Sequence, residues 1–422
     1  MHVRRKADSG YISLMHLSLR LALAVLFAAG TTTSAVAASA DTCDQACQVE
    51  AAWQQQHQNA LPRTAFYDAP DPLPWAPAGT LIRRAPADYT VGRATRILYH
   101  SRTSAGRDVA ASGVVLAPAG DPPRGGWPVV VDAHGTSGIA RDCAPSLMKD
   151  LYHGDQMTRF VEQGYAVVAP DYAGLGTTGR QEALNKTAEA NDLLYALRAS
   201  RGLGLSHRWL VWGHSQGGGA TLGLAERFAG DRPPGYLGAV VTSPVTELRT
   251  LVDTLAGSPY TSGFIPLVAQ GASYSDHRIR PERLLTDAAA QRLPLTTTGC
   301  LNVVLAGYQD LTGPALVRPR FADDPAFTRY LTRNTTGRAP IGGPVLLLQG
   351  DADTAVPRTV TDGVAARLCG LGSTVDYRTY PGLGHDTGYG VTGIDDGAMP
   401  DILAWAHDRF AGRPAATTCE AR

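Results

Sequence analysis

The sequence has no excess of charge of either sign. Its 422 residues include 38 Lys and Arg against 38 Asp and Glu, so the formal net charge is +0. Basic residues form no stripe, and there is no basic run beyond Arg4-Arg5-Lys6. Proteins that bind nucleic acids usually concentrate positive charge on one surface, where it contacts phosphates. We therefore expect no nucleic-acid partner.

The apolar run near the N-terminus, residues 21–29, is too short to cross a bilayer comfortably. Basic residues precede it, and small residues follow it as far as Ala38-Ser39-Ala40, which has the A-x-A form of a cleavage site. The pattern predicts a signal peptide over residues 1–40, cleaved before Asp41, and a secreted or periplasmic protein. An uncleaved membrane anchor is the alternative.

Cysteine is scarce and scattered through the chain. The six cysteines are Cys43, Cys47, Cys143, Cys300, Cys369 and Cys419. They lack the paired C-x-x-C spacing of zinc sites, so we expect no metal. An even number of cysteines in an exported chain favours disulfides. The sequence does not determine the connectivity; we expect Cys143–Cys300 and Cys369–Cys419, with Cys43 and Cys47 as the remaining pair.

A Gly-x-Ser-x-Gly pattern at residues 213–217 joins an apolar, β-prone run to a helix-forming run, residues 220–228. This order predicts a nucleophile elbow, a sharp strand-to-helix turn with Ser215 at its tip. Side chains at Gly213 and Gly217 would collide with the turn. The backbone N–H of Gln216 would lie at a helix N-terminus, where it can stabilise developing negative charge. A Gly-rich turn with an unreactive serine is the alternative.

Short apolar strands alternate with helical segments along most of the chain. The strands are expected near residues 127–131, 165–169, 208–212, 237–242 and 345–349, after a hairpin over residues 95–117. The alternation predicts an α/β fold with a doubly wound, mostly parallel sheet. Ligands of such sheets bind at the carboxyl ends of the strands.

This alternation stops between residues 246 and 340, which contain helical runs and many prolines. So long an insertion is unlike a bare loop, and we expect a helical cap that excludes water from the active site. A helical decoration remote from the site is the alternative. The expected organisation is therefore an N-terminal arm (residues 41–90), a core in two segments (91–245 and 341–422) and the cap (246–340).

A nucleophilic Ser215 requires a base, and the base requires an orienting acid. His385 lies in a Gly-rich loop after a strand, where catalytic bases are commonly placed, whereas His407 lies in an amphipathic helix and is expected at the surface or in packing. Two acids, Asp351 and Asp353, follow the strand at residues 345–349. We prefer Asp353 because it lies further into the turn.

A second donor for an oxyanion is expected after the strand at residues 127–131. That strand ends in Asp132-Ala133-His134-Gly135-Thr136-Ser137-Gly138. A strand followed by His-Gly-x is where hydrolases of this architecture place the second donor. We assign it to the backbone N–H of Thr136, with that of Gln216 as the first. For His134 itself, structural packing is the alternative.

With these residues in view, the chain resembles the α/β-hydrolase superfamily and, more narrowly, the secretory lipase family of secreted yeast lipases and bacterial relatives. The matching segments are Phe66-Tyr67, residues 77–83, 98–101, 109–118, 134–138, 143–146, 169–172, 213–218, 350–353 and Gly384-His385. The resemblance implies carboxylic-ester hydrolysis, a helical cap, structural disulfides and no metal or organic cofactor.

We therefore expect a secreted serine esterase or lipase that works through an acyl-enzyme on Ser215, with His385 as the base and Asp353 as its acid. The expected substrate is a small-molecule or lipid ester, with transient contact with a lipid interface, and the expected state is a monomer. Acyl transfer to an alcohol or amine, peptide hydrolysis by an exported peptidase, and a catalytically silent binding protein are the alternatives.

Overall fold

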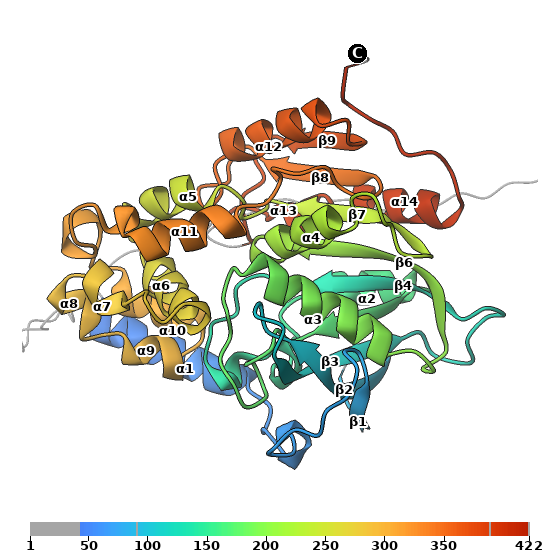
Figure 1. Cartoon of the computed structure of the whole chain (residues 1–422), viewed down its shortest axis with the longest axis horizontal. Helices are drawn as coiled ribbons and strands as arrows, with labels where there is room; N and C mark the ends of the chain where they lie inside the picture. The colour runs from blue at the N-terminus through green and yellow to red at the C-terminus, as the bar shows by residue number, and fades with distance from the viewer. Residues whose placement is uncertain (1–42, 90–91, 388–389, 421–422) are drawn as a thin grey trace, which may run out of the picture. The chain divides into compact units, whose positions relative to one another are not determined.

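One sheet of nine strands forms the centre of the structure (Figure 1). The structure is a computed structural model that describes residues 43–89, 92–387 and 390–420. The predicted signal peptide lies outside these residues. The strands are β1 (Leu81–Ala87), β2 (Arg93–Arg102), β3 (Asp108–Ala117), β4 (Trp127–Ala133), β5 (Ala166–Pro170), β6 (Leu205–His214), β7 (Tyr236–Thr242), β8 (Val345–Gly350) and β9 (Val375–Tyr380).

The strand order is β1-β2-β3-β5-β4-β6-β7-β8-β9. β1, β2, β3 and β5 pair in antiparallel fashion, whereas the pairs from β5 to β9 are parallel. The mostly parallel sheet predicted from the alternation of strands and helices is therefore confirmed. Its parallel strands are buried because helices cover both faces.

Fourteen α-helices are formed by the described residues. They are α1 (Gln45–Asn59), α2 (Gly154–Glu162), α3 (Lys186–Ala199), α4 (Gln216–Arg227), α5 (Leu248–Ala256), α6 (Phe264–Ser275), α7 (Pro281–Leu284), α8 (Asp287–Ala290), α9 (Pro294–Thr298), α10 (Leu301–Tyr308), α11 (Pro325–Asn334), α12 (Arg358–Gly370), α13 (Ile394–Gly397) and α14 (Met399–Phe410). None of the described helices combines the length and the apolar character needed to cross a membrane.

Alternate residues of the central strands contribute to two different cores. In β4, Val129 and Val131 pack into the core that α3, α4 and α12 share, whereas Val130 packs into the core that α2 and α14 share. This is the period-two alternation of a strand that is covered on both sides. The sheet is therefore doubly wound, as the sequence predicts.

Residues 246–340 form the helices α5 to α11, which gather at one side of the sheet (Figure 1). They have a core of their own, to which Leu251, Ile265, Val304 and Phe327 belong. We call these residues the helical insertion. Its separate core explains how the chain can leave the α/β pattern for so long and still bury its apolar side chains.

The N-terminal segment differs in part from the predicted arm. Leu81–Ala87 is not an arm but the edge strand β1, paired with β2, so the sheet begins before residue 91. Before it, α1 packs against α10 of the helical insertion, where the Gln45 amide donates to the carbonyl oxygen of Gly307 at 3.1 Å. The N-terminal segment therefore pairs with the sheet through β1 and packs against the insertion through α1.

Three disulfides join Cys43 to Cys47, Cys143 to Cys300 and Cys369 to Cys419, which are the pairs expected from the sequence. The second joins the loop after β4 to the start of α10, two segments that lie 157 residues apart in the chain. It therefore joins the helical insertion to the same loop of the core that contains Thr136.

Candidate active site

Ser215 lies at the turn between β6 and α4 in a backbone conformation that is unusual for a residue with a side chain, with φ 56° and ψ −118°. A Cβ atom at Gly217 would lie 1.7 Å from the carbonyl oxygen of Ala133, and one at Gly213 would lie 2.3 Å from that of Gly217. Only glycine fits at these two positions. The turn is therefore the strained elbow that the sequence predicts at this point.

The side chains of Ser215, His385 and Asp353 form a continuous hydrogen-bonded chain. Nε2 of His385 lies 2.8 Å from Oγ of Ser215, and Nδ1 lies 2.8 Å from Oδ2 of Asp353. The other carboxylate oxygen of Asp353 accepts from the backbone N–H groups of Ala355 and Val356, which fixes its orientation. In this arrangement an imidazole can remove the proton of a serine hydroxyl.

Charges around His385 favour its protonated form. Burial of the ring opposes protonation, but the carboxylates of Asp353, Asp386 and Asp395 outweigh it and raise the pKa of His385 from 6.5 to about 9. Burial alone would raise the pKa of Asp353, but His385 and the N–H of Val356 hold that pKa below its ordinary value. Asp353 is therefore ionised and stabilises a proton on the imidazole.

The other acid and the other histidines considered from the sequence lie outside this hydrogen-bonded chain. Asp351 is exposed and accepts from the backbone N–H of Gly382, while His407 is exposed on α14. His134 is buried, its Nδ1 lies 2.7 Å from the carbonyl oxygen of Gly135, and its ring packs against Tyr172. Burial lowers the pKa of His134 to about 4, which is the environment of a neutral packing histidine.

Thr136 and Gln216, the two residues expected to stabilise an oxyanion, are joined to each other. The hydroxyl of Thr136 donates to Oε1 of Gln216 at 2.9 Å. Gln216 is the first residue of α4, so its backbone N–H has no carbonyl partner within that helix. Both residues line the same pocket as Ser215 and His385. Their N–H groups are therefore the candidates for stabilising negative charge on a bound carbonyl oxygen.

Glu189 of α3 is a site residue that the sequence analysis missed. Its carboxyl oxygen accepts from the side-chain amide of Gln216 at 2.7 Å and from the backbone N–H of Leu184 at 2.8 Å. Burial raises the pKa of Glu189 well above its ordinary value, which favours the uncharged acid. Nothing in its helical spacing distinguishes it from an ordinary helix residue, so the sequence offered no signal.

An apolar pocket opens beside Ser215, and side chains of α5 and α6 form much of its wall. The pocket leaves about 40 Å³ of free volume. Its apolar lining from these helices consists of Leu248, Leu251, Val252, Leu255, Phe264, Leu267 and Val268. A larger groove of about 640 Å³ runs along α1, but Ser215 and His385 do not line it. Size alone therefore does not locate the site.

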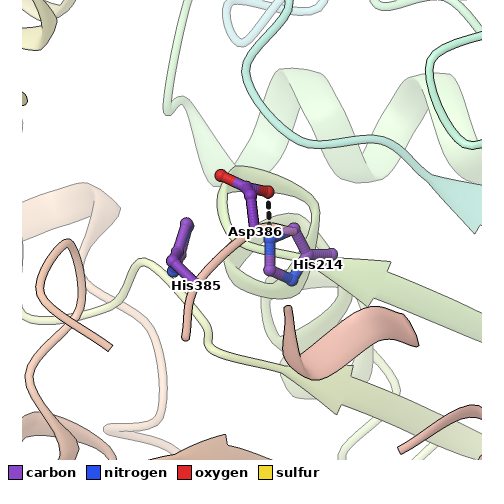
Figure 2. Close-up of side chains that lie close together, drawn as sticks. All are labelled: His214, His385 and Asp386. Carbon is purple, nitrogen blue, oxygen red and sulfur yellow. Dashed lines mark hydrogen bonds and ion pairs between the residues drawn. The ribbon is translucent and has the colours of Figure 1, made fainter. Parts of the chain in front are cut away.

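His214 and Asp386 lie beside His385 (Figure 2), and potential ligand atoms of the three residues lie within 4.8 Å of one another. Both ring nitrogens of His385 already contact other groups, Ser215 and Asp353. Hydrogen bonds explain this cluster, and we assign no metal ligand to it. Sequence analysis missed the pair although each member is next in the chain to a predicted site residue.

Comparison with known proteins gives curated relatives that are all lipases by name. Lipase 10 of Candida albicans is 26% identical over 281 residues, which are 62% of this chain and 58% of that protein. The secreted triacylglycerol lipase LIP7 of Malassezia globosa is 25% identical over 325 residues, covering 69% of this chain and 66% of that protein. The chain thus spans less than two thirds of the length of each of these relatives.

Solved structures show the same fold at low identity. Candida antarctica lipase A has a TM-score of 0.72 and 19% identity, over 85% of this chain and 89% of that one. The rice cell wall degrading esterase LipA from Xanthomonas oryzae has a TM-score of 0.62 and 19% identity, over 80% of this chain and 97% of that one. Both are lipases or esterases with an α/β-hydrolase fold.

The profile of the family described as Secretory lipase matches residues 154–418, which include Ser215, Asp353 and His385. The match covers more than half of the chain and runs from α2, before the nucleophile elbow, to the end of the core. This chain therefore belongs to the secretory lipase family.

Proposed function

We propose that this protein is a secreted lipase or esterase that hydrolyses carboxylic esters through an acyl-enzyme on Ser215. The observation that carries the proposal is the hydrogen-bonded chain from Ser215 through His385 to Asp353, in which Ser215 and His385 line an apolar pocket. Family membership and the names of the relatives support the same activity.

In the first half of the reaction, His385 removes the proton of Ser215 as its oxygen attacks the ester carbonyl. The negative charge on the carbonyl oxygen is stabilised by the backbone N–H groups of Thr136 and Gln216. When the tetrahedral intermediate breaks down, His385 gives the proton to the leaving alcohol, and the acyl group remains on Ser215.

In the second half, His385 removes a proton from a water molecule, which attacks the acyl-enzyme. Breakdown of the second intermediate returns the proton to Ser215 and releases the carboxylic acid. Asp353 orients the ring through Nδ1 in both halves and stabilises the imidazolium that forms in each.

The apolar pocket is the proposed site of the acyl chain, because its wall offers α5 and α6 side chains and few polar groups. Its free volume of about 40 Å³ is small, a few times the roughly 10–15 Å³ that a single water molecule needs by the same measure. A short acyl group therefore fits this arrangement, while a long chain requires α5 and α6 to move apart.

The test is hydrolysis of p-nitrophenyl esters from acetate to palmitate, together with emulsified triglyceride, by the wild type and by Ser215→Ala. We expect the variant to lose activity by about 10⁴- to 10⁶-fold while its circular dichroism spectrum and melting temperature remain unchanged. Ester hydrolysis at the wild-type rate by Ser215→Ala would exclude this mechanism. Product analysis with an added alcohol distinguishes hydrolysis from acyl transfer.

A further inference from the structure

The residue before the proposed nucleophile and the residue after the proposed base contact each other. His214 precedes Ser215 at the end of β6, and Asp386 follows His385 in the loop after β9. Figure 2 shows Asp386 beside the ring of His214, whose Nε2 lies 3.2 Å from Oδ1 of Asp386. Two side-chain hydrogen bonds therefore join the elbow to the loop that carries His385, one between Ser215 and His385 and one between His214 and Asp386.

His214 is a fixed anchor for this second contact. Its side chain is only 1% exposed, and its Nδ1 lies 3.1 Å from the hydroxyl of Thr242 on β7. The ring of His153, itself paired with Asp132, lies 6.2 Å from it. Because an ionised carboxylate can only accept, His214 donates to Asp386 through Nε2.

The contact between Ser215 and His385 cannot persist through the reaction. In the acyl-enzyme, Oγ of Ser215 is an ester oxygen and has no proton to donate to His385. The bond from Nδ1 to Asp353 is then the remaining hydrogen bond of the ring, which also packs against the ring of His214 with 4.7 Å between the ring centroids. A ring with one hydrogen bond can turn away from the position that deacylation requires unless its loop is held in place. The His214–Asp386 contact does not involve Ser215 Oγ, so acylation leaves it intact.

We propose that Asp386 is a positioning residue, whose contact with His214 keeps His385 in place while Ser215 is acylated and so allows water to release the acyl group. The inference rests on the proposed function. Other bonds hold the loop: that from the backbone N–H of Gly384 to the carbonyl oxygen of Thr392 lies within it, and that from the backbone N–H of Ala352 to the carbonyl oxygen of Leu383 joins it to the loop after β8. Asp386 joins it to the elbow.

Asp386 also acts on His385 through its charge. The groups that face His385 are Asp353 from the loop after β8, Asp386 from its own loop, Asp395 from α13 and His214 from β6. Since Asp386 contributes to the raised pKa of His385, removing its charge lowers that pKa. The rise of activity with pH then moves to lower pH, a change that loss of packing alone would not produce.

The experiment compares Asp386→Ala with Asp386→Asn in rapid-mixing assays with p-nitrophenyl acetate and in mass spectrometry of the quenched enzyme. In Asp386→Ala we expect deacylation to slow by roughly ten- to a hundredfold, with acylation changed much less, so that the acyl-enzyme accumulates. In Asp386→Asn the amide oxygen still accepts from His214. On the alkaline plateau deacylation therefore stays near the wild-type rate, while the rise of activity with pH moves to lower pH.

Asp351→Ala is the matched control, because it removes a contact of the same loop, with the N–H of Gly382, that does not reach the elbow. We expect no accumulation of acyl-enzyme in this variant. His214→Phe keeps a ring but removes the contact from the other side, and should reproduce the effect of Asp386→Ala. It also tests the proposal if Asp386→Ala does not fold.

Equal slowing of acylation and deacylation in both Asp386→Ala and His214→Phe would overturn the proposal, as would accumulation of acyl-enzyme in the Asp351→Ala control. Failure of the proposed function has a different outcome. In that case the wild type forms no acyl-enzyme with any ester, and Ser215→Ala is as active as the wild type.

Discussion

At the scale of single residues, the side chain of Gln216 binds other side chains of the site. The amide of Gln216 accepts from Thr136 and donates to Glu189, so one side chain joins the loop after β4, the elbow and α3. We therefore expect this side chain to influence the spacing of the two backbone N–H groups proposed for the oxyanion. Preorganised donors of this kind contribute more than donors that must reorient during the reaction.

Gln216→Ala should lower kcat by roughly tenfold and change KM little, because the backbone N–H groups remain but Thr136 loses its partner. Complete removal of an oxyanion donor costs more, about 10²–10³ in kcat. The measurement is steady-state kinetics on a short ester. Gln291→Ala, at an exposed position of the helical insertion, is the control. Unchanged kcat in Gln216→Ala would show that the side chain does not set the spacing.

The pH dependence of activity should follow His385. A base must be unprotonated, and the pKa of His385 lies at about 9. The value of kcat/KM should therefore rise with pH, by about tenfold per pH unit well below that pKa, and level off above it. The measurement is kcat/KM on p-nitrophenyl acetate across this range, with Ser215→Ala subtracted for spontaneous hydrolysis. A profile that is flat from neutral to alkaline pH would contradict the assignment.

At the scale of elements, two helices of the insertion form much of the wall of the proposed acyl pocket. α5 and α6 belong to the core of the helical insertion, yet several of their side chains face Ser215. The α/β sheet supplies the reacting groups, while the insertion supplies the wall of the pocket. Acyl-chain preference should therefore change through α5 and α6 without any change to the reacting groups.

Leu251→Ala should raise the kcat/KM of a longer ester relative to acetate by roughly tenfold, because the removed carbons leave room for methylenes worth about 0.8 kcal/mol each when buried. The measurement is the ratio of kcat/KM values across the p-nitrophenyl series. Leu331→Ala on α11 is the control, since Leu331 is buried in the same core but does not line the pocket. An equal shift in both variants would mean general loosening of the insertion.

At the scale of the whole molecule, covalent bonds join parts that the sheet does not join. Cys143–Cys300 connects the core to the helical insertion across 157 residues, whereas Cys43–Cys47 closes a loop of only 4. In the chain-entropy account, a cross-link stabilises the fold by restricting the unfolded chain, and more so for a longer loop. The two bonds should therefore differ in their effect on stability.

Replacing both Cys143 and Cys300 by Ser should lower the free energy of unfolding by about 5 kcal/mol, and the same change at Cys43 and Cys47 by about 2 kcal/mol. Urea denaturation of the two double variants and the wild type gives the comparison. Equal losses in the two variants would contradict the dependence on loop length.

Some features were predictable because they depend on neighbouring residues. The residues of the elbow are contiguous in the sequence, since the glycines and Ser215 must occupy one turn. β1 was not predicted, because Leu81–Ala87 contains two adjacent arginines and Pro86 rather than an apolar run. Proline is tolerated there because β1 is an edge strand, and only its pairing with β2 makes it part of the sheet.

The sequence by itself determined the doubly wound sheet and the strained turn at Ser215, since the period of a strand and the placement of glycines are local properties, and its resemblance to known sequences indicated the family. Only the tertiary structure decided which side chains support the site. Glu189 meets Gln216 across 27 residues, and Asp386 meets His214 across 172. The sequence around an acidic residue does not indicate which partner its carboxyl group will contact. That partner depends on which helix packs beside which strand end, and folding alone sets this.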